Sequence, residues 1–221
     1  MPVLIPGESK MAVYPISYSP AALERAFDVS GTTDILGPPA LIVLRKDKSA
    51  AAIIYAEPVL DENDELRHPV VAKLDLIPRK SARQNESIVA VKRYWESKAV
   101  SQVEGIVVDN SARDTRVATT LYEHLIVEQD LILMSDHEQY IGGQAIWKRI
   151  ARSSKDISVF ILDTESGCFY PYDGERVCYD CECIPESEIW SLSPDESHHG
   201  IVLVAEKRAG FSVDEGLVSQ A

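Results

Sequence analysis

The sequence predicts a mixed α/β domain built on a single sheet that is flanked by helices. Apolar runs of strand length dominate residues 40–77, whereas strands and helices alternate from residue 103 onward. Apolar residues make up 45% of the chain and charged residues 26%, which is the usual balance of a globular protein with a buried core. With 221 residues, the chain is long enough for one large domain or for a domain with an added subdomain.

The N-terminal part is expected to contain one helix and a hairpin. Residues 1–18 contain several prolines and are predicted to be irregular. Ser19 and Pro20 are typical of the N-cap and the first position of a helix, which would continue through the sequence AALERAF. The apolar runs 40–45 and 51–57 are separated by the polar sequence KDKS, and this spacing predicts an antiparallel hairpin.

Further elements follow in order along the chain. The acidic stretch 61–65 is expected to be an exposed turn, and 69–77 a third strand. Residues 81–98 are predicted to be helical because apolar side chains recur near helical spacing, at Ile88, Val91, Tyr94 and Trp95. The elements expected after that are a strand at 103–108, a helix at 115–127, a short buried strand at 131–134, a helix at 143–151, and strands at 157–162 and 201–205. The tail at 212–221 is expected to be frayed.

The chain is acidic, with a formal net charge of −13. Such a charge disfavours nucleic acids and anionic membranes as partners, and no long basic run offsets it. The acidic residues are scattered, which favours solubility over the alternative of a surface for a basic partner. No apolar run reaches membrane-span length and the N-terminus lacks a signal peptide, so we expect a cytoplasmic protein.

The segment between the strand at 103–108 and the following helix suggests a ligand site. The first N–H groups of a helix have no partner within the helix, and together with the helix dipole they favour an anion such as a pyrophosphate. Arg113 and Arg116 would add charge and hydrogen-bond donors, and the small residues Ala118 and Thr119 would allow close approach. The alternative is an ordinary turn with solvated arginines.

This segment resembles the pyrophosphate loop of the GNAT superfamily, the acyl-CoA-dependent N-acetyltransferases. That loop reads R/Q-x-x-G-x-G/A, and this chain has Arg113-x-x-Arg116-x-Ala118. The resemblance follows the order of elements over about residues 40–205 and is specific over 103–162. It implies a GNAT-like domain at 19–211 with its cofactor half at about 102–162. It also implies that acetyl-CoA binds here. The thioester carbonyl would lie against the strand, at Ile106, Val107 and Val108. The pyrophosphate would lie on the turn, at Arg113, Arg116, Val117, Ala118 and Thr119.

Two positions depart from the family pattern. Arg116 stands where the family has a glycine, and Trp147 stands where many members have a tyrosine that protonates the leaving thiolate. An indole cannot be that acid, so Tyr140 is the substitute. The general base that the resemblance implies is Glu104 or Asp136, and a structural role is open for either.

The four cysteines lie close together in the sequence, in a segment of different composition at about 167–188. One Cys-x-x-Cys pair is formed by Cys178 and Cys181, and such a pair is half of a structural zinc site. The other two cysteines are Cys183 and, upstream, Cys168. The spacing does not match a complete site, so we expect reduced cysteines in an insertion, without zinc.

Two functions are therefore expected from the sequence. The first is transfer of an acetyl group from acetyl-CoA to a primary amine on a small molecule or a protein. The second is a GNAT-like domain that has lost catalysis and binds another protein, with a homodimer or a protein partner as the assembly. A distant third reading is a zinc-stabilised α/β protein unrelated to acyltransferases.

Overall fold

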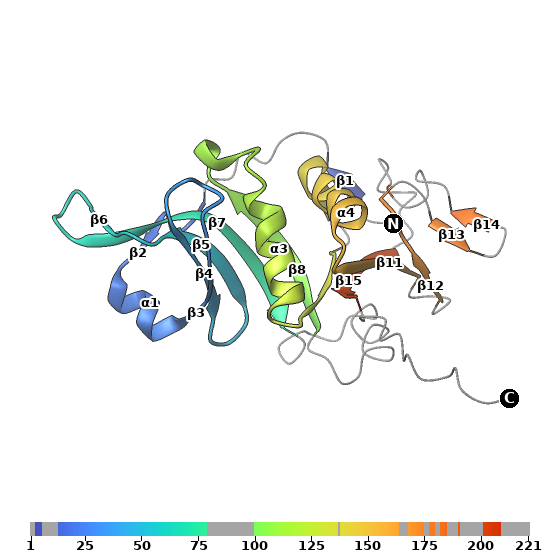
Figure 1. Ribbon diagram of the computed structural model, residues 1–221, viewed down its shortest axis with the longest axis horizontal. Coiled ribbons are helices and arrows are strands. Elements are labelled where there is room, and N and C mark those ends of the chain that lie inside the picture. The colour runs from blue at the N-terminus through green and yellow to red at the C-terminus, as the bar shows by residue number, and fades with distance from the viewer. Residues whose placement is uncertain are drawn as a thin grey trace, which may run out of the picture.

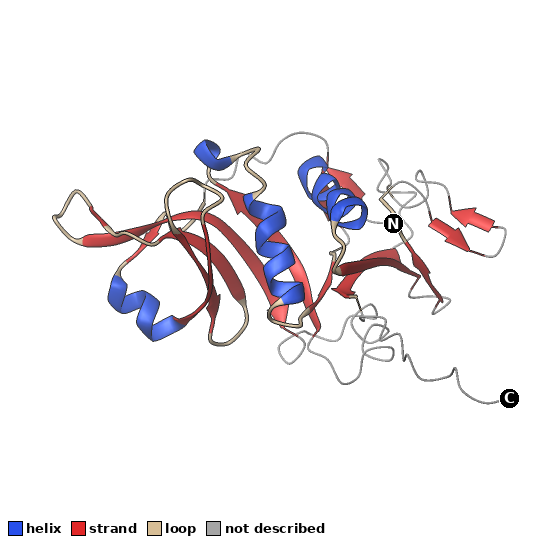
Figure 2. Cartoon of the chain, viewed as in Figure 1, coloured by secondary structure: helices blue, strands red, loops and turns tan. Residues whose placement is uncertain are grey.

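One large, mostly antiparallel sheet organises this mixed α/β chain (Figure 1). A computed structural model describes residues 3–5, 13–78, 100–136, 138–163, 168–174, 177–179, 182–184, 190 and 201–208. Helices α3 and α4 lie side by side on one face of the sheet, and α1 lies at its other end (Figure 2). The expectation of a mixed α/β fold with a single main sheet and flanking helices is confirmed at this level.

The large sheet contains eleven strands. In chain order they are β2 (Ser17–Tyr18), β3 (Phe27–Thr33), β4 (Ala40–Arg45), β5 (Ala50–Tyr55), β6 (Val59–Leu60), β7 (Leu66–Pro78), β8 (Val100–Val108), β9 (Ile132–Met134), β11 (Ile157–Asp163), β12 (Cys168–Pro171) and β15 (Ile201–Lys207). Their main spatial order is β12-β11-β15-β9-β8-β7-β5-β4-β3, and β2 and β6 pair with β7 outside this path.

The first half of the sheet is an antiparallel meander. The predicted hairpin is confirmed as β4 and β5, and the predicted third strand is confirmed as β7, which is longer than expected. The acidic turn at 61–65 connects β6 to β7, as expected. Strand β3, which the sequence pattern did not predict, forms the edge beside β4.

Two short strands lie in the N-terminal segment that was expected to be irregular, so that expectation is wrong at these two places. β1 (Val3–Ile5) pairs in parallel with β10 (Glu138–Tyr140), and β2 pairs with β7. Both are too short to give a recognisable sequence alternation, and each is fixed by its partner strand rather than by local preference.

Helix α1 (Pro20–Ala26) begins as the sequence predicts. The Ser19 hydroxyl accepts a hydrogen bond from the Ala22 N–H at 3.2 Å, and Pro20 occupies the first helical turn. Leu23 and Ala26 pack against the face of the meander that is opposite α3. Capping of this kind is worth about 1 kcal/mol to a helix.

Helices α3 (Val117–Val127) and α4 (Ile141–Ser153) cover the other face. The main core cluster lies beneath them and includes Leu121, Leu125 and Trp147, all fully buried. Helix α3 starts two residues later than expected, because Arg116 has a left-handed backbone with φ of 67° and cannot continue a right-handed helix. The predicted strands at 131–134, 157–162 and 201–205 are confirmed as β9, β11 and β15.

Several expectations fall outside the described residues. The helix predicted at 81–98 and the tail at 212–221 are among them. Within the cysteine-rich segment, β13 (Val177–Tyr179) and β14 (Glu182–Ile184) form a small antiparallel hairpin. No helix in the described part of the chain is long and apolar enough to cross a lipid bilayer.

Candidate functional site

The two edges of β8 are paired to very different extents. On one edge, β8 pairs with β7 from Ser101 through Val108. On the other edge, it pairs in parallel with β9 only over Val100–Gln102. Within the described residues, the edge of β8 from 103 to 108 therefore has no neighbouring strand on this side. Backbone N–H and C=O groups on such an edge need a partner, which can be water or a ligand.

A bulge in β8 lies at the point where the two parallel strands separate. Leu76 pairs with Val103 and Asp75 with Gly105, so Glu104 is the extra residue. The bulge puts Val103 and Ile106 on the same face, in contact with the core under α3, although residues three positions apart face opposite sides of a regular strand. Glu104 itself is exposed. Bulges bend a strand and increase its twist, and this one lies directly after the last residue pair between β8 and β9.

The loop after β8 is ordered by its own hydrogen bonds. Asp109 caps the short 3₁₀ turn Asn110–Ala112, and its carboxylate accepts hydrogen bonds from the Ser111 N–H at 2.9 Å and the Ser111 hydroxyl at 2.5 Å. These two bonds are the main reason that the pKa of Asp109 is lowered, and the Arg113 charge adds a smaller effect. Asp109 thus acts as the capping carboxylate of this turn, and the capping bonds favour its charged form.

The N-terminus of α3 has no side-chain cap. The first hydrogen bond of the helix runs from the Thr120 N–H to the Arg116 carbonyl at 2.9 Å, so the N–H groups of residues 117–119 precede the helical ladder. Arg113 and Arg116 are both exposed beside this end, Ala118 is half-buried, and Val117 and Thr119 are buried. The predicted cofactor residues of the turn are thus gathered around one helix N-terminus.

Asp136 lies just after β9, half-buried, and it is close to α3. Its charge raises the pKa of Tyr122, although burial of the phenol is the larger cause of that shift. Tyr122 is 1% exposed and was not singled out from the sequence, where it looks like one more apolar position of an amphipathic helix. Of the candidate bases, Asp136 is half-buried and close enough to Tyr122 to affect its pKa, whereas Glu104 is exposed. Tyr140 ends β10, and its side chain lies outside the described residues.

Trp147 occupies the core between the two helices. It is fully buried, and its ring meets Tyr122 edge to face with centroids 5.7 Å apart. The indole N–H of Trp147 has no hydrogen-bond partner among the described residues. The side chain at this position fills the interface between α3 and α4 and does not reach a solvent-accessible surface.

A second polar cluster lies on the outer face of α3, where the sequence gave no signal. The Nε2 atom of His124 is 3.0 Å from the Ser30 hydroxyl, which donates to the Ile42 carbonyl at 3.1 Å. A Cβ atom on Gly31 would lie 2.6 Å from the His124 ring, so the contact requires glycine there. Burial lowers the pKa of His124, an effect opposed by the Glu128 charge. These residues adjoin an open hollow of about 490 Å³, which includes Thr32, Thr33, Glu123, Lys155 and Asp156 in its lining. The hollow reaches toward the arginine turn, because the Arg116 charge lowers the pKa of Glu123 against the larger effect of burial.

The cysteines are placed only by their backbone. Cys178 and Cys183 are direct partners across the β13–β14 hairpin, Cys168 begins β12, and Cys181 lies outside the described residues. Among the residues whose positions are described, no three His, Cys, Asp or Glu side chains gather as a metal site requires.

No protein-family model, curated protein or solved structure matches the chain.

Proposed function

We propose that the chain is a GNAT-like N-acyltransferase that moves an acetyl group from acetyl-CoA to a primary amine. The observation that carries this proposal is the open edge of β8, which adjoins an uncapped helix N-terminus with two arginines. In the GNAT family, the thioester carbonyl pairs with a strand that diverges from its parallel neighbour. Here that strand would be β8, through the backbone at Ile106, Val107 and Val108.

The pyrophosphate of the cofactor would bind at the N-terminus of α3. The N–H groups of Val117, Ala118 and Thr119 would donate to it, and the helix dipole favours its charge. Arg116 stands at the glycine position of the family loop, and its φ of 67° is a conformation that glycine adopts without strain. The backbone of the turn thus supports the resemblance even though the residue does not.

The chemistry would be direct attack by the amine nitrogen on the thioester carbonyl. A C–N bond forms, the C–S bond breaks, the amine loses a proton to a carboxylate, and the thiolate takes up a proton. Asp136 is the better candidate for the base, because it lies beside the buried Tyr122, and Glu104 is the alternative. Tyr140 is the candidate acid for the thiolate.

The second candidate is a domain of the same fold that has lost catalysis and binds another protein. The burial of Trp147 favours it, since this side chain fills the core at the position where many family members have their acid. Arg116 in place of glycine favours it as well, since a Cβ narrows the approach of a phosphate to the turn.

Titration calorimetry with acetyl-CoA separates these candidates. We expect binding to the intact chain, weakened about tenfold by Arg113→Ala, which corresponds to about 1.4 kcal/mol. Arg25→Ala is the matched control, because Arg25 is an exposed arginine on α1 at the far end of the sheet. No heat at millimolar acetyl-CoA would overturn the proposal.

Turnover is measured next, as release of the free thiol with spermidine or a lysine peptide as acceptor. Asp136→Asn should lower the rate by about 10²-fold or more while acetyl-CoA still binds, as removal of a general base predicts. Binding of the cofactor without transfer to either acceptor would favour the binding module.

A further inference from the structure

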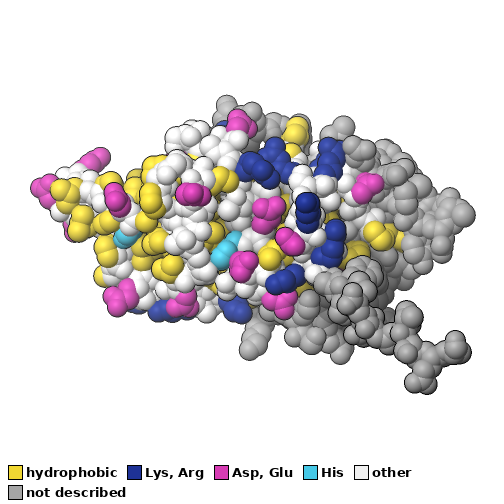
Figure 3. All heavy atoms as spheres, in the orientation of Figure 1, with side chains coloured by type: hydrophobic (Ala, Val, Ile, Leu, Met, Phe, Trp, Pro, Cys, Tyr) yellow, Lys and Arg dark blue, Asp and Glu magenta, His cyan; other side chains and the backbone are white. Residues whose placement is uncertain are grey.

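The hairpin of β6 and β7 projects from the body of the protein (Figure 1). It presents apolar side chains to solvent. Leu60 is 63% exposed and Leu66 is 51% exposed, and Ile16, next to β2, is 72% exposed. Figure 3 shows apolar side chains gathered at this end of the molecule, with acidic side chains at the tip. We call Ile16, Leu60 and Leu66 the ribbon surface.

The three side chains of the ribbon surface share one face. Leu60 lies directly opposite Leu66. The Val70 N–H donates to the Ile16 carbonyl at 2.9 Å, and Tyr18 lies opposite His68, so Ile16 lies opposite Val70. Residues 66, 68 and 70 of β7 point to the same side, because side chains alternate along a strand. Val70 is buried in the cluster beneath α1, so the ribbon surface continues a core face beyond the helix that covers it.

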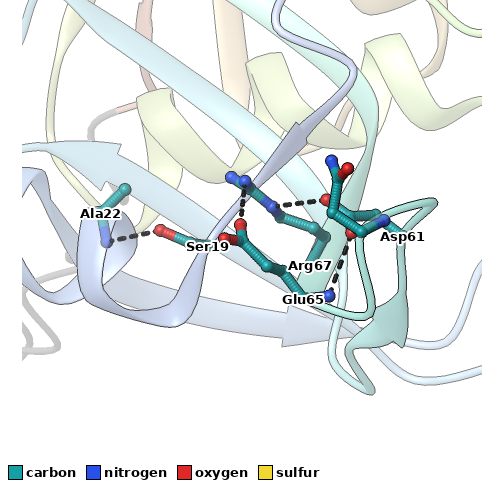
Figure 4. Close-up of polar contacts among 6 residues, drawn as sticks. Ser19, Ala22, Asp61, Glu65 and Arg67 are labelled. Carbon is teal, nitrogen blue, oxygen red and sulfur yellow. Dashed lines mark hydrogen bonds and ion pairs between the residues drawn. The ribbon is translucent and has the colours of Figure 1, made fainter.

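The turn beside this surface has an excess of negative charge. Residues 57–67 contain five carboxylates and one arginine. Arg67 pairs with Asp61 at 3.1 Å and with Glu65 at 2.5 Å (Figure 4). Glu62 and Asp64 are exposed and make no ion pair with any residue that the structure describes.

The turn is also ordered before any partner binds. The Asp61 carboxylate accepts hydrogen bonds from the N–H groups of Asn63 at 2.8 Å and Glu65 at 3.0 Å. A preformed surface loses less conformational entropy on binding than a flexible one.

We propose that the ribbon surface docks a basic, amphipathic segment of a partner protein. Apolar side chains of that segment would cover Ile16, Leu60 and Leu66, and its lysines or arginines would meet Glu62 and Asp64. Charge complementarity selects this occupant, because a second copy would bring two acidic turns together and an anionic membrane would be repelled. The inference does not depend on the proposed acyl transfer.

The test uses the full chain and a labelled synthetic peptide of alternating leucine and lysine, with binding followed by fluorescence anisotropy. The double variant Leu60→Ser/Leu66→Ser should weaken binding at least tenfold, and Glu62→Gln/Asp64→Asn should weaken it to a similar degree. The matched controls are Val29→Ser and Asp28→Asn, which replace an exposed valine and an exposed aspartate on the edge strand β3. The controls should change the affinity less than twofold.

Three results would overturn the proposal. The first is equal weakening by the ribbon and β3 variants, or no binding of the peptide. The second is a dimer of the chain, detected by sedimentation, that Leu60→Ser/Leu66→Ser dissociates, since a second copy would then be the occupant. The third is binding to anionic phospholipid vesicles that the same double variant abolishes. Unfolding in urea confirms that each variant is folded before it is compared.

Discussion

The two edges of β8 provide the sharpest contrast in this molecule. Toward β7, the ladder continues from Ser101 to Val108, whereas toward β9 it stops after Gln102. The opening is not the end of the sheet, because β9 continues into β15 and β11. Within the described residues, β8 is therefore paired on both edges at Ser101 and Gln102 and only with β7 beyond them.

Helix α3 lies over this part of the sheet, where it contacts β8, β9 and β15, and α4 packs beside it. Leu121 and Tyr122 of α3 and Trp147 of α4 are fully buried against each other and the sheet. Changes in this layer should therefore affect the open edge more than changes in the meander.

Truncation of Trp147 should give the largest effect. Trp147→Ala leaves a cavity between the two helices and removes the contact with Tyr122, so we expect a loss of about 3–5 kcal/mol in the free energy of unfolding. Urea denaturation followed by circular dichroism measures this. Trp147→Phe should cost less than half as much, because a ring remains and the unpartnered N–H is removed. Equal losses for the two variants would contradict the packing argument.

Crowding at Gly31 should give a smaller loss. A Cβ in Gly31→Ala would lie 2.6 Å from the His124 ring, and we expect a destabilisation of about 1–3 kcal/mol in urea denaturation. Gly105→Ala is the matched control, since an added Cβ there meets no atom within 4 Å and should cost little. Adding His124→Ala to Gly31→Ala should recover part of the loss. Strict additivity of the two changes would show that the contact is not responsible.

His124 should also make stability depend on pH. Burial lowers its pKa below the ordinary 6.5, so the folded state favours the neutral ring. The contribution of the neutral ring is fully present above pH 6.5 and is lost as the pH falls through the lowered pKa of the folded state. We expect the urea midpoint of the wild type to fall more between pH 7.5 and pH 5 than that of His124→Gln. Parallel midpoints for the two proteins would exclude this role.

Relief of the left-handed turn should give the smallest effect. A left-handed backbone costs a non-glycine residue about 1–2 kcal/mol of stability, and Arg116→Gly removes this cost. Glycine in turn costs about 0.5–1 kcal/mol, because the unfolded chain gains entropy. The free energy of unfolding should therefore rise by about 0.5 kcal/mol. Thermal unfolding would show this as a rise of about 1–2 °C. Arg113→Gly is the matched control, because Arg113 has φ of −62° and gains nothing from glycine. In the proposed enzyme, Arg116→Gly should also tighten acetyl-CoA binding, and weaker binding would instead identify Arg116 as a phosphate ligand.

Sequence patterns predicted the fold well where periodicity was long. The β4–β5 hairpin, α1 with its cap, and the order β8, α3, β9, α4 all follow from apolar spacing and from Ser19-Pro20. Strand β3 was missed because its sequence, FDVSGTT, has a bulge at Ser30 that breaks the alternation. The start of α3 was placed too early because nothing in its sequence signals a left-handed arginine.

The site was less accessible to sequence reasoning than the fold. The arginine turn and Asp136 could be named, since both follow strands where open sheets bind ligands. The roles of Tyr122 and of the Ser30–His124 contact could not, because they depend on pairs that are 14 and 94 residues apart in the chain. The position of Glu104 as the extra residue of a bulge is revealed only by the register of β7 and β8.

Strand β7 connects the ribbon surface to the open edge of β8. Its first residue, Leu66, belongs to the ribbon surface, and Ala72 lies opposite Val108 at the open edge of β8. Six residues of one strand separate these points, which corresponds to about 20 Å. Because β7 is a continuous strand, the distance between the ribbon surface and the open edge is fixed. A partner segment bound at the ribbon surface would then reach the open edge only with side chains about six extended residues away from the residues that are bound. The length of β7 would then decide which lysine of a bound protein can be reached.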